Sequence, residues 1–131
     1  MKTSKKEDYA IVLMSALAKN YNEYISLKSV SDKYKLPYPF MKQISNDLVN
    51  SNLLKTKGGA FGGYKLAKSP KDISWREILV AVSGEPQFAK CVGNKEICPV
   101  LSKCPAASAW SEVQCVILQA LDNVKLSDFL M

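Results

Sequence analysis

The segment LLKTKGGAFGGYKLAK, residues 53–68, decides the fold that this sequence is expected to adopt. Two short runs of alternating side chains flank a glycine-rich turn, a pattern typical of a β-hairpin. Leu54 and Thr56 alternate in the first run, and Tyr64 and Leu66 alternate in the second. The glycines supply the turn and let the backbone approach other segments closely. The segment lacks the G-K-S/T ending of a phosphate-binding loop and does not open a helix, so that function is not expected.

Helical segments precede the hairpin. Residues 6–19 contain no glycine or proline and repeat apolar side chains at helical spacing. Ser26 is a candidate N-cap for a short helix that ends near Tyr34. The prolines of KLPYPF, residues 35–40, disfavour helix at the residues before them, and a new helical pattern starts after Pro39. Two short helices, a tight break and a further helix fit the helix-turn-helix pattern.

The helix after Pro39 has an apolar and a polar face. Phe40, Ile44 and Leu48 recur every four residues as an apolar stripe, and lysine and amide side chains occupy the opposite face. A plain helical bundle would give the same pattern in this segment alone. The hairpin that follows favours a winged helix-turn-helix, in which this helix reads DNA and the hairpin lysines lie along the DNA backbone. The expected DNA contacts are Tyr38, Lys42, Gln43, Asn46, Lys55, Lys57 and Lys65.

Basic residues are concentrated in the N-terminal two thirds of the chain. The 131 residues have a formal net charge of +6; residues 1–90 carry fifteen basic and eight acidic side chains, and residues 91–131 carry three and four. Such a block suits a phosphate-rich partner, and a solvated lysine surface would have the same composition. The reading helix has no arginine for a bidentate contact with guanine; Gln43 and Asn46 can read adenine, and Lys42 can read guanine less selectively. We therefore expect double-stranded DNA with an AT-leaning palindromic operator, its half-sites about one helical turn apart.

Two further helices are expected after the hairpin. Ser74 and Glu77 have the spacing of a capping box for a helix from Trp75 to about Ser83. Pro105 occupies the first turn of a helix of about twenty residues with a long apolar stripe. That stripe could dock on its own domain or pair with a second copy, and pairing is favoured because helix-turn-helix proteins usually act as dimers. The tail VKLSDFLM is expected to fold back onto the body.

Three cysteines lie between these helices, in AKCVGNKEICPVLSKCPAASAW, residues 89–110. Cys91, Cys98 and Cys104 have the spacing C-x6-C-x5-C, in a chain without histidine. Structural zinc sites usually present closer pairs, whereas an iron–sulfur cluster is larger and can be wrapped by widely spaced ligands. Three reduced thiols without a cofactor are the alternative. Cys115, within the long helix, is expected to be a buried and inert thiol.

These segments, with DYAIVLMSALA in the first helix and SPKDISWREILVAVSGEP after the hairpin, resemble the winged-helix regulators of the IscR and NsrR type, the Rrf-two family. The resemblance covers nearly the full chain. KEDYA, CPV with CPAASAW, and VKLSDF look most like regulators of the SUF iron–sulfur assembly system. The resemblance implies a homodimer in which Cys91, Cys98 and Cys104 hold an iron–sulfur cluster, of the 2Fe–2S or the 4Fe–4S type. It also implies that the state of the cluster changes DNA affinity, so that the protein represses or activates genes.

One departure from the family pattern concerns the fourth ligand of the cluster. In IscR-like members a histidine three residues after the last cysteine completes the site, and this chain has Ala107 there. In NsrR-like members an aspartate early in the first helix of the other subunit completes it, and Asp8 stands at the matching place. The resemblance therefore implies Asp8 as the fourth ligand, with Glu7 as the next choice. The alternative for Asp8 is an acid that only complements the helix dipole.

Together these features predict a mainly α-helical protein in one integrated domain. A winged helix-turn-helix head, with three helices and a hairpin wing, is expected over residues 1–72, and a cluster-binding loop with a dimerisation helix over residues 73–131. The predicted function is a cytoplasmic, homodimeric transcriptional regulator that binds DNA, senses iron–sulfur, redox or nitrosative status, and controls iron–sulfur assembly genes. No membrane association is expected, because no apolar run approaches a membrane span and the N-terminus lacks the apolar core of a signal peptide.

Two alternatives to this function stay open. One is a cofactor-free regulator in the same fold that acts through thiol oxidation or a partner protein. The other is an iron–sulfur carrier or redox protein, which would need neither the basic hairpin nor the amide-faced helix. An enzyme is not expected, since the chain lacks histidine, paired loop acids and an activated nucleophile.

Overall fold

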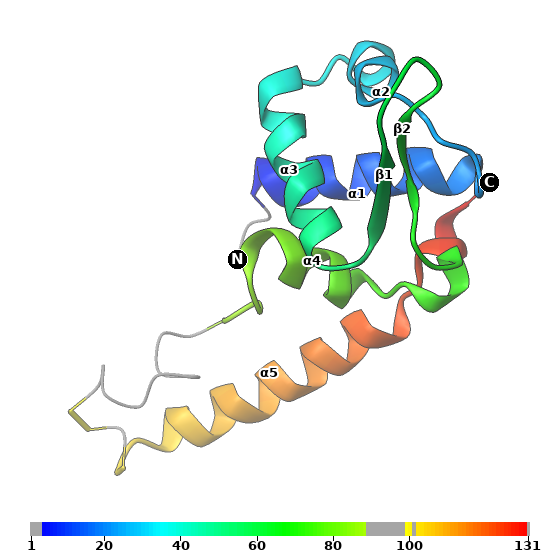
Figure 1. The fold of residues 1–131 in the computed structure, drawn as a ribbon. Coiled ribbons are helices and arrows are strands. Elements are labelled where there is room, and N and C mark those ends of the chain that lie inside the picture. Colours follow the sequence, from blue (N-terminus) through cyan, green and yellow to red (C-terminus); the bar gives the residue numbers. More distant parts are fainter. Residues whose placement is uncertain (1–3, 89–98, 101, 131) are drawn as a thin grey trace.

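The computed structural model describes residues 4–88, 99–100 and 102–130, and it arranges them as a head with one long helix extending away from it (Figure 1). The mainly α-helical winged helix-turn-helix expected from the sequence is confirmed. No described helix is both long and apolar enough to cross a membrane. The elements in chain order are α1 (Lys5–Lys19), α2 (Leu27–Tyr34), α3 (Tyr38–Asn50), β1 (Leu54–Lys57), β2 (Gly63–Leu66), η1 (Pro70–Asp72), α4 (Trp75–Ser83), α5 (Pro105–Asn123) and η2 (Leu126–Phe129).

Local sequence signals define where the helices of the head begin. Helix α1 has a full capping box: the Ser4 hydroxyl accepts the N–H of Glu7 at 3.2 Å, and the Glu7 carboxylate accepts the N–H of Ser4 at 3.0 Å. Ser26 caps α2, as predicted, by accepting the N–H of Ser29 at 3.1 Å. Helix α3 begins at Tyr38 and not after Pro39, because proline is tolerated in a first turn, where its missing N–H has no helical partner.

One apolar core holds the head together. Leu13 of α1 and the α3 residues Met41, Ile44 and Leu48 each have 0% of their surface exposed and belong to the same cluster. Phe40, the first residue of the predicted stripe, is only partly buried at the edge of this core. Burying a large apolar side chain contributes about 1.5–3 kcal/mol. The stripe predicted on α3 is therefore the part of this helix that fixes it against α1.

The hairpin has the register that the alternation in the sequence predicts. Leu54 pairs with Leu66 and Thr56 pairs with Tyr64 across the two antiparallel strands. Residues opposite one another in an antiparallel pair share a face. The two leucines are buried in the core of the head, so the intervening pair of lysines lies on the other face.

A third segment pairs with the hairpin. Ile25, in the linker before α2, bridges Tyr64 through two backbone hydrogen bonds of 2.9 and 2.8 Å. Gly63 makes this approach feasible: it has a φ of +148°, and a Cβ on it would lie 2.3 Å from the carbonyl oxygen of Ile25. The bridge joins the wing to the helix-turn-helix.

The capping box predicted at the start of α4 is only half present. The Ser74 hydroxyl accepts the N–H of Glu77 at 3.1 Å, so the N-cap is confirmed. The second half of the expected capping box is wrong, because the Glu77 carboxylate pairs instead with the ammonium of Lys68 at 2.7 Å. The helix ends at Ser83 as predicted, and Gly84 caps it with a φ of +78°.

Helix α5 is attached to the head near its C-terminal end. Arg76 of α4 binds the carboxylate of Asp122 at 2.7 Å and also binds Glu85. Hydrogen bonds to Glu85 and Asp122 raise the pKa of Arg76 above its ordinary value, so the guanidinium stays charged. Beyond α5 the chain folds back onto the body, as predicted, through a β-bridge between Ser74 and Lys125 and the burial of Leu126.

Candidate functional site

Helix α3 presents a polar face at the surface of the head. Lys42, Gln43 and Asn46 are exposed, as the sequence predicted, and Tyr38 at the start of the helix is 41% exposed. Amide and ammonium groups of this kind read base edges when a helix lies in the major groove of DNA. The single acid in this stretch, Asp47, pairs with Lys6 at 3.0 Å, so its negative charge is offset.

The hairpin lysines are ordered around a tyrosine. Lys55 and Lys57 are exposed, whereas Lys65 is half-buried, because its side chain lies against Tyr24. The ammonium of Lys65 is 4.8 Å from the centroid of the Tyr24 ring, and that of Lys57 is 5.6 Å from the same ring. Each such cation–π contact contributes about 0.5–1 kcal/mol at an exposed site. Tyr24 thus holds two of the three predicted wing contacts beside each other.

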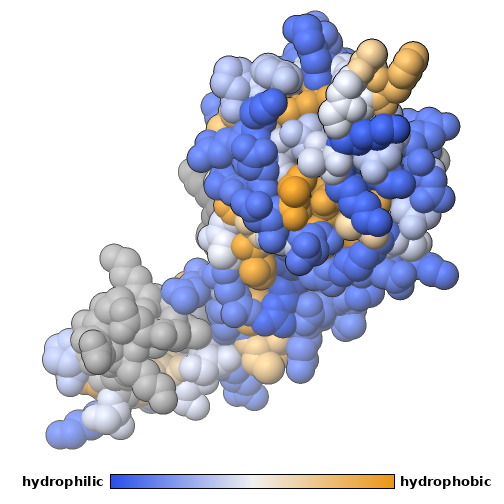
Figure 2. Space-filling view, in the orientation of Figure 1, coloured by the Kyte–Doolittle hydropathy of each residue, from blue (hydrophilic) through white to orange (hydrophobic). Residues whose placement is uncertain are grey.

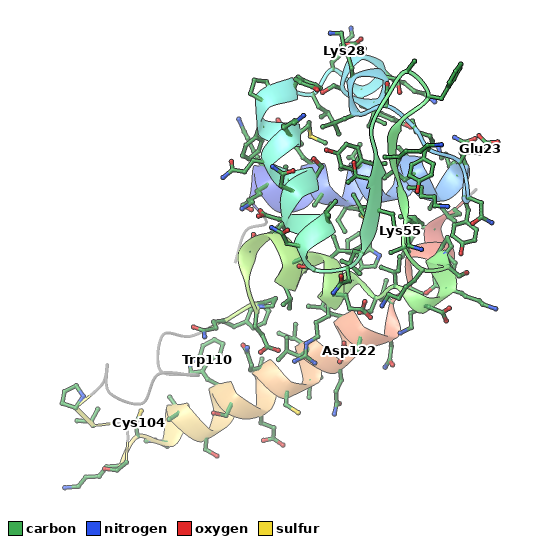
Figure 3. The ribbon with its side chains drawn as sticks, viewed as in Figure 1. Glu23, Lys28, Lys55, Cys104, Trp110 and Asp122 are labelled. Atoms are coloured by element: carbon green, nitrogen blue, oxygen red, sulfur yellow. The ribbon has the colours of Figure 1, made fainter. Side chains whose placement is uncertain are left out.

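The elements that carry most of the predicted DNA-binding groups meet at one end of the molecule, while Lys55 lies lower on the hairpin (Figure 3). The turn of the hairpin, helix α2 and the N-terminal end of α3 all lie at the end of the head that faces away from α5 (Figure 1). Lys28 projects at this end from α2 (Figure 3), with its ammonium 6.0 Å from the ring of Tyr38. A positive surface with amide side chains between the lysines is a suitable interface for a nucleic acid.

Helix α5 carries an apolar face that the described part of one chain does not cover. Trp110, Val113 and Val116 are 43%, 42% and 60% exposed, although they belong to or adjoin the predicted stripe. Hydrophobic atoms are visible at the surface beneath the hydrophilic head (Figure 2). Cys115, predicted to be buried, is exposed, because it lies two positions from both Val113 and Ile117, on the side of α5 away from the stripe that packs toward α4.

The predicted cluster ligands fall partly outside the described residues. Cys91 and Cys98 belong to the stretch 89–98, which the structure does not describe. Cys104 is the N-cap residue of α5, and its half-buried side chain makes no capping hydrogen bond. Figure 3 shows it at the end of α5 that is remote from the head. The positive end of a helix dipole stabilises an anionic group such as a thiolate.

Asp8 lies in the first turn of α1 and is exposed. Its carboxylate forms no hydrogen bond or ion pair with another described residue, whereas the Glu7 carboxylate is engaged in the capping box. Across residues 4–88, 99–100 and 102–130, no three His, Cys, Asp or Glu side chains come together. The described part of one chain therefore does not bring Cys104 and Asp8 into a common site.

Gln114 connects α5 to the segment that precedes residues 89–104, which contain Cys91, Cys98 and Cys104 and are called the thiol loop below. It is only 7% exposed; its side-chain carbonyl accepts the N–H of Phe88 at 3.1 Å, and its amide donates to the carbonyl of Pro86. Phe88 in turn lines a cavity of about 230 Å³ between α1, α4 and α5, together with Asp8 and Trp75. Phe88, the last described residue before the cysteines, is thus bound to α5 and lines a cavity that the first turn of α1 also lines.

Comparison with known proteins identifies the class. The Rrf2 family, described as an iron-dependent transcriptional regulator, matches residues 3–131. The chain belongs to this family, the one named from the sequence resemblance, and its class is that of winged-helix, DNA-binding transcriptional regulators.

Individual relatives carry related names. CymR of Bacillus subtilis is 29% identical over 130 residues, covering 98% of this chain and 88% of CymR. NsrR of Bacillus licheniformis is 26% identical over 133 residues, covering 100% of this chain and 93% of NsrR. IscR of Aliivibrio salmonicida is 26% identical over 132 residues, covering 100% of this chain and 78% of IscR. All three are HTH-type transcriptional regulators, and none is named as an enzyme.

Solved structures agree on the fold. CymR of B. subtilis, described as the global cysteine regulator, has a TM-score of 0.81 at 27% identity over 98% of this chain and 95% of that one. IscR of T. potens has a TM-score of 0.77 at 29% identity, covering 98% and 85%. The oxidized form of Staphylococcus aureus CymR has a TM-score of 0.71 at 29% identity, covering 96% and 93%. The names agree on transcriptional regulation, and they do not agree on one signal.

Three residues that shape these sites were not found from the sequence. Tyr24 contacts lysines of the hairpin, which are more than thirty positions later in the sequence. Lys28 contacts Tyr38, on the other side of the proline-containing segment between α2 and α3. No local sequence pattern links either pair. Gln114 did have a signal, because it is a polar residue within the apolar stripe of α5, four positions after Trp110 and three before Ile117. A polar residue at a stripe position is buried only when hydrogen-bonded, so it predicts a partner.

Proposed function

We propose that this protein is a homodimeric regulator that binds AT-leaning palindromic DNA and senses iron–sulfur or redox status through a cluster held by cysteine. The observation that carries the DNA-binding part is the shared end of the head, where the N-terminal end of α3 lies beside α2, with its exposed Lys28, and the turn of the hairpin. In this proposal residues 1–72 read DNA and residues 73–131 sense and dimerise. The regulated genes are those of iron–sulfur assembly.

The reading helix would enter the major groove. Gln43 and Asn46 can each make the bidentate contact that selects adenine, while Lys42 contributes a less selective contact with guanine. The hairpin and α2 lysines would neutralise phosphates on either side. Each neutralised phosphate adds about 0.9 to the slope of log affinity against log salt concentration.

Dimerisation would cover the apolar face of α5. The exposure of Trp110, Val113 and Val116 in a single chain supports this step, since such side chains gain about 25 cal/mol for each Å² removed from water. A symmetric dimer would also place two reading helices for the two halves of a palindrome.

The donor chemistry suits an iron–sulfur cluster, because thiolates are its usual ligands. Cys104 supports this assignment: its side chain is not used in capping, and it sits at the positive end of α5. Cys91 and Cys98 would complete the cysteine set. Bound there, the cluster would supply a redox-sensitive centre, and the chain would hold it at the junction of the thiol loop and α5.

Asp8 would provide the fourth ligand from the second subunit. It is exposed and uncommitted among the described residues, whereas Glu7 is engaged in capping, which favours Asp8 over Glu7. An oxygen ligand on α1 would connect the state of the cluster to the head of the neighbouring subunit. That connection is a physical route from the cluster to DNA affinity.

The sensor part is tested by anaerobic purification, with iron, sulfide and zinc measured per chain beside the visible absorption spectrum. We expect iron and sulfide with thiolate-to-iron absorption in the wild type and in Cys115→Ser, and their loss in Cys104→Ser. Asp8→Ala should retain the cysteines but lose the cluster faster in air. Equal cluster content and lifetime in Asp8→Ala and the wild type would exclude Asp8 as a ligand.

The DNA-binding part is tested by selection of duplexes from a randomised library. We expect enrichment of AT-leaning palindromes, and a steep fall of affinity with salt. Enrichment of guanine-rich sites would contradict the proposed reading by Gln43 and Asn46.

The dimer is tested by Val116→Asp, which places like charges on a symmetric interface and costs several kcal/mol there. Light scattering after size exclusion should report a dimer for the wild type and a monomer for the variant. Tyr21→Asp, at an exposed site of the head, is the matched control and should stay dimeric.

A second candidate function is regulation by thiol oxidation without a cofactor. The exposure of Cys115 and the similarity to a CymR solved in an oxidized form favour it. Metal-free protein that still binds DNA, and whose affinity changes on reversible oxidation, would select this function over the cluster sensor.

A further inference from the structure

The turn of the hairpin exposes a phenylalanine. Phe61 has 89% of its surface exposed, more than any other large hydrophobic side chain among the described residues. Hydrophobic atoms project from the top of the head, at the end where the hairpin turns (Figure 2). A phenylalanine left in water does not gain the roughly 1.5–3 kcal/mol of stabilising free energy that its burial would provide.

The local backbone does not explain this residue. The N–H of Gly62 donates to the carbonyl of Gly59 at 3.1 Å, so Ala60 and Phe61 are the central residues of a closed turn. Turns favour glycine, asparagine, aspartate, serine or proline at such positions, each for a backbone reason that phenylalanine lacks. A Cβ on Gly62 would lie 2.2 Å from the carbonyl oxygen of Lys57, so the turn has little freedom to bury the ring.

The surroundings of the ring are narrow and basic. Gly58, Gly59, Gly62 and Gly63 flank the two central residues and add no side chains, so the tip is slim. At the base of the tip, Lys57 and Lys65 are held on Tyr24, at 5.6 and 4.8 Å from its ring. The minor groove of B-DNA is about 6 Å wide and strongly negative in A·T-rich sequence. A slim apolar tip with two lysines at its base has the shape and the charge to enter it.

We propose that Phe61 is an apolar wedge that enters the minor groove beside the reading helix and partly unstacks one base step. This inference rests on the proposed DNA binding and adds a specificity-determining residue to it. Apolar wedges of this kind kink the duplex by about 20–90° toward the major groove. Steps of the TA and CA type unstack most easily, so the wedge selects them at a position that no hydrogen bond reads.

The wedge predicts a second element in the operator. With α3 in the major groove, each wing reaches the minor groove on one side of its half-site, so the preferred step recurs symmetrically. Lys57 and Lys65, side by side on the Tyr24 ring, contact phosphates along one wall of that groove, and Tyr24 positions them without touching DNA.

The test uses full-length protein and a duplex that the wild type itself selects from a randomised library. Dyes at the two ends of the duplex report its bend by energy transfer, and titration reports affinity. Phe61→Ala should straighten the duplex by on the order of 20° for each wing. It should also weaken binding about tenfold for each wing, the size expected for the loss of one stacking contact in each half-site.

Three variants separate a wedge from a general loss of apolar surface or of positive charge. Phe61→Leu keeps an apolar wedge and should retain most of the bend. Phe129→Ala, the same change at a phenylalanine that is 62% exposed on η2, should alter neither the bend nor the affinity. Lys55→Ala should lower the salt slope by about 1 for each subunit of the dimer without changing the bend.

The outcomes distinguish the two proposals. If the wild type and Phe61→Ala bend the selected duplex equally and bind it with equal affinity, the wedge is overturned and DNA binding is left intact. A library from which the wild type enriches no duplex overturns DNA binding, and the wedge with it. Loss of the bend in Phe61→Ala with retention in Phe61→Leu establishes the wedge.

Discussion

The head and helix α5 use their apolar residues in opposite ways. Helix α3 is 13 residues long and has Met41, Ile44 and Leu48 completely buried within the same chain. Helix α5 has 19 residues, and among those described its one buried side chain is Gln114. The head is therefore stabilised by contacts that one chain makes with itself, whereas α5 leaves much of its apolar surface exposed in the described part of the chain. Similar sequence patterns lead to different structural roles because only the head surrounds its stripe with other elements.

The largest expected effect tests this difference directly. Ile44→Ala removes fully buried methyl groups and should lower the free energy of unfolding by about 2–5 kcal/mol. Val113→Ala, at a site 42% exposed on α5, should change it by about 0.5 kcal/mol or less in monomeric protein. Urea titrations at low protein concentration measure the free energy of unfolding of both variants. Equal losses would mean that α5 is buried within the monomer.

The next effect concerns the buried amide. Gln114→Ala leaves the N–H of Phe88 and the carbonyl of Pro86 without their partner, which should cost about 1–3 kcal/mol. If the thiol loop binds a cluster, this variant should also lose iron faster in air, because the loop is no longer fixed to α5. Gln119→Ala, an exposed glutamine on the same helix, is the matched control. Retention of wild-type stability in both variants would show that the two hydrogen bonds of Gln114 are not formed in solution.

A smaller effect is expected at the cap of α4. Ser74→Ala removes the acceptor for the N–H of Glu77 and should cost about 1 kcal/mol. Glu77→Ala should cost less, because the Glu77 carboxylate pairs with Lys68 at the surface and does not complete the capping box. The melting temperatures of the two variants are compared by thermal unfolding. A larger loss in Glu77→Ala would indicate that the capping box forms in solution.

The smallest effect is that of a single wing contact. Lys55→Ala should leave stability unchanged and reduce the slope of log affinity against log salt by about 1 for each subunit of the dimer. Lys19→Ala, an exposed lysine at the end of α1, should leave the slope unchanged. Salt titrations on one selected duplex provide the comparison. Identical slopes for the wild type and Lys55→Ala would remove this residue from the interface.

The head could be predicted from the sequence because its signals are local. The Ser26 cap, the stripe on α3 and the alternation of the hairpin each specify an element within a few residues, and all three are confirmed. Long-range pairings could not be predicted in the same way. The half-burial of Lys65 depends on Tyr24, forty-one positions earlier, and the second half of the predicted capping box failed because Lys68 competes for Glu77.

The predictions for the candidate site likewise succeeded where the signal was local and failed or stayed untested where it was not. Exposure of Lys42, Gln43 and Asn46 followed from helical periodicity alone. The burial predicted for Cys115 was wrong, because this residue is two positions from both Val113 and Ile117 and so lies on the side of α5 away from the stripe. The assignment of Cys91, Cys98, Cys104 and Asp8 to a cluster stays a prediction, since it depends on a second subunit and on residues outside those described.

The attachment of α5 by Arg76 has a mechanical consequence. Arg76 fixes the helix near Asp122, so α5 forms an arm whose free end, at Pro105, is about 26 Å away. A tilt of about 10° at the fixed end would displace the free end by about 5 Å, more than one base-pair step of about 3.4 Å. In a dimer joined along these arms, a small rotation between α4 and α5 would be enough to move one reading helix out of phase with the other. Control of DNA affinity would then need no refolding of the head, only a change in the angle at which the arm leaves it.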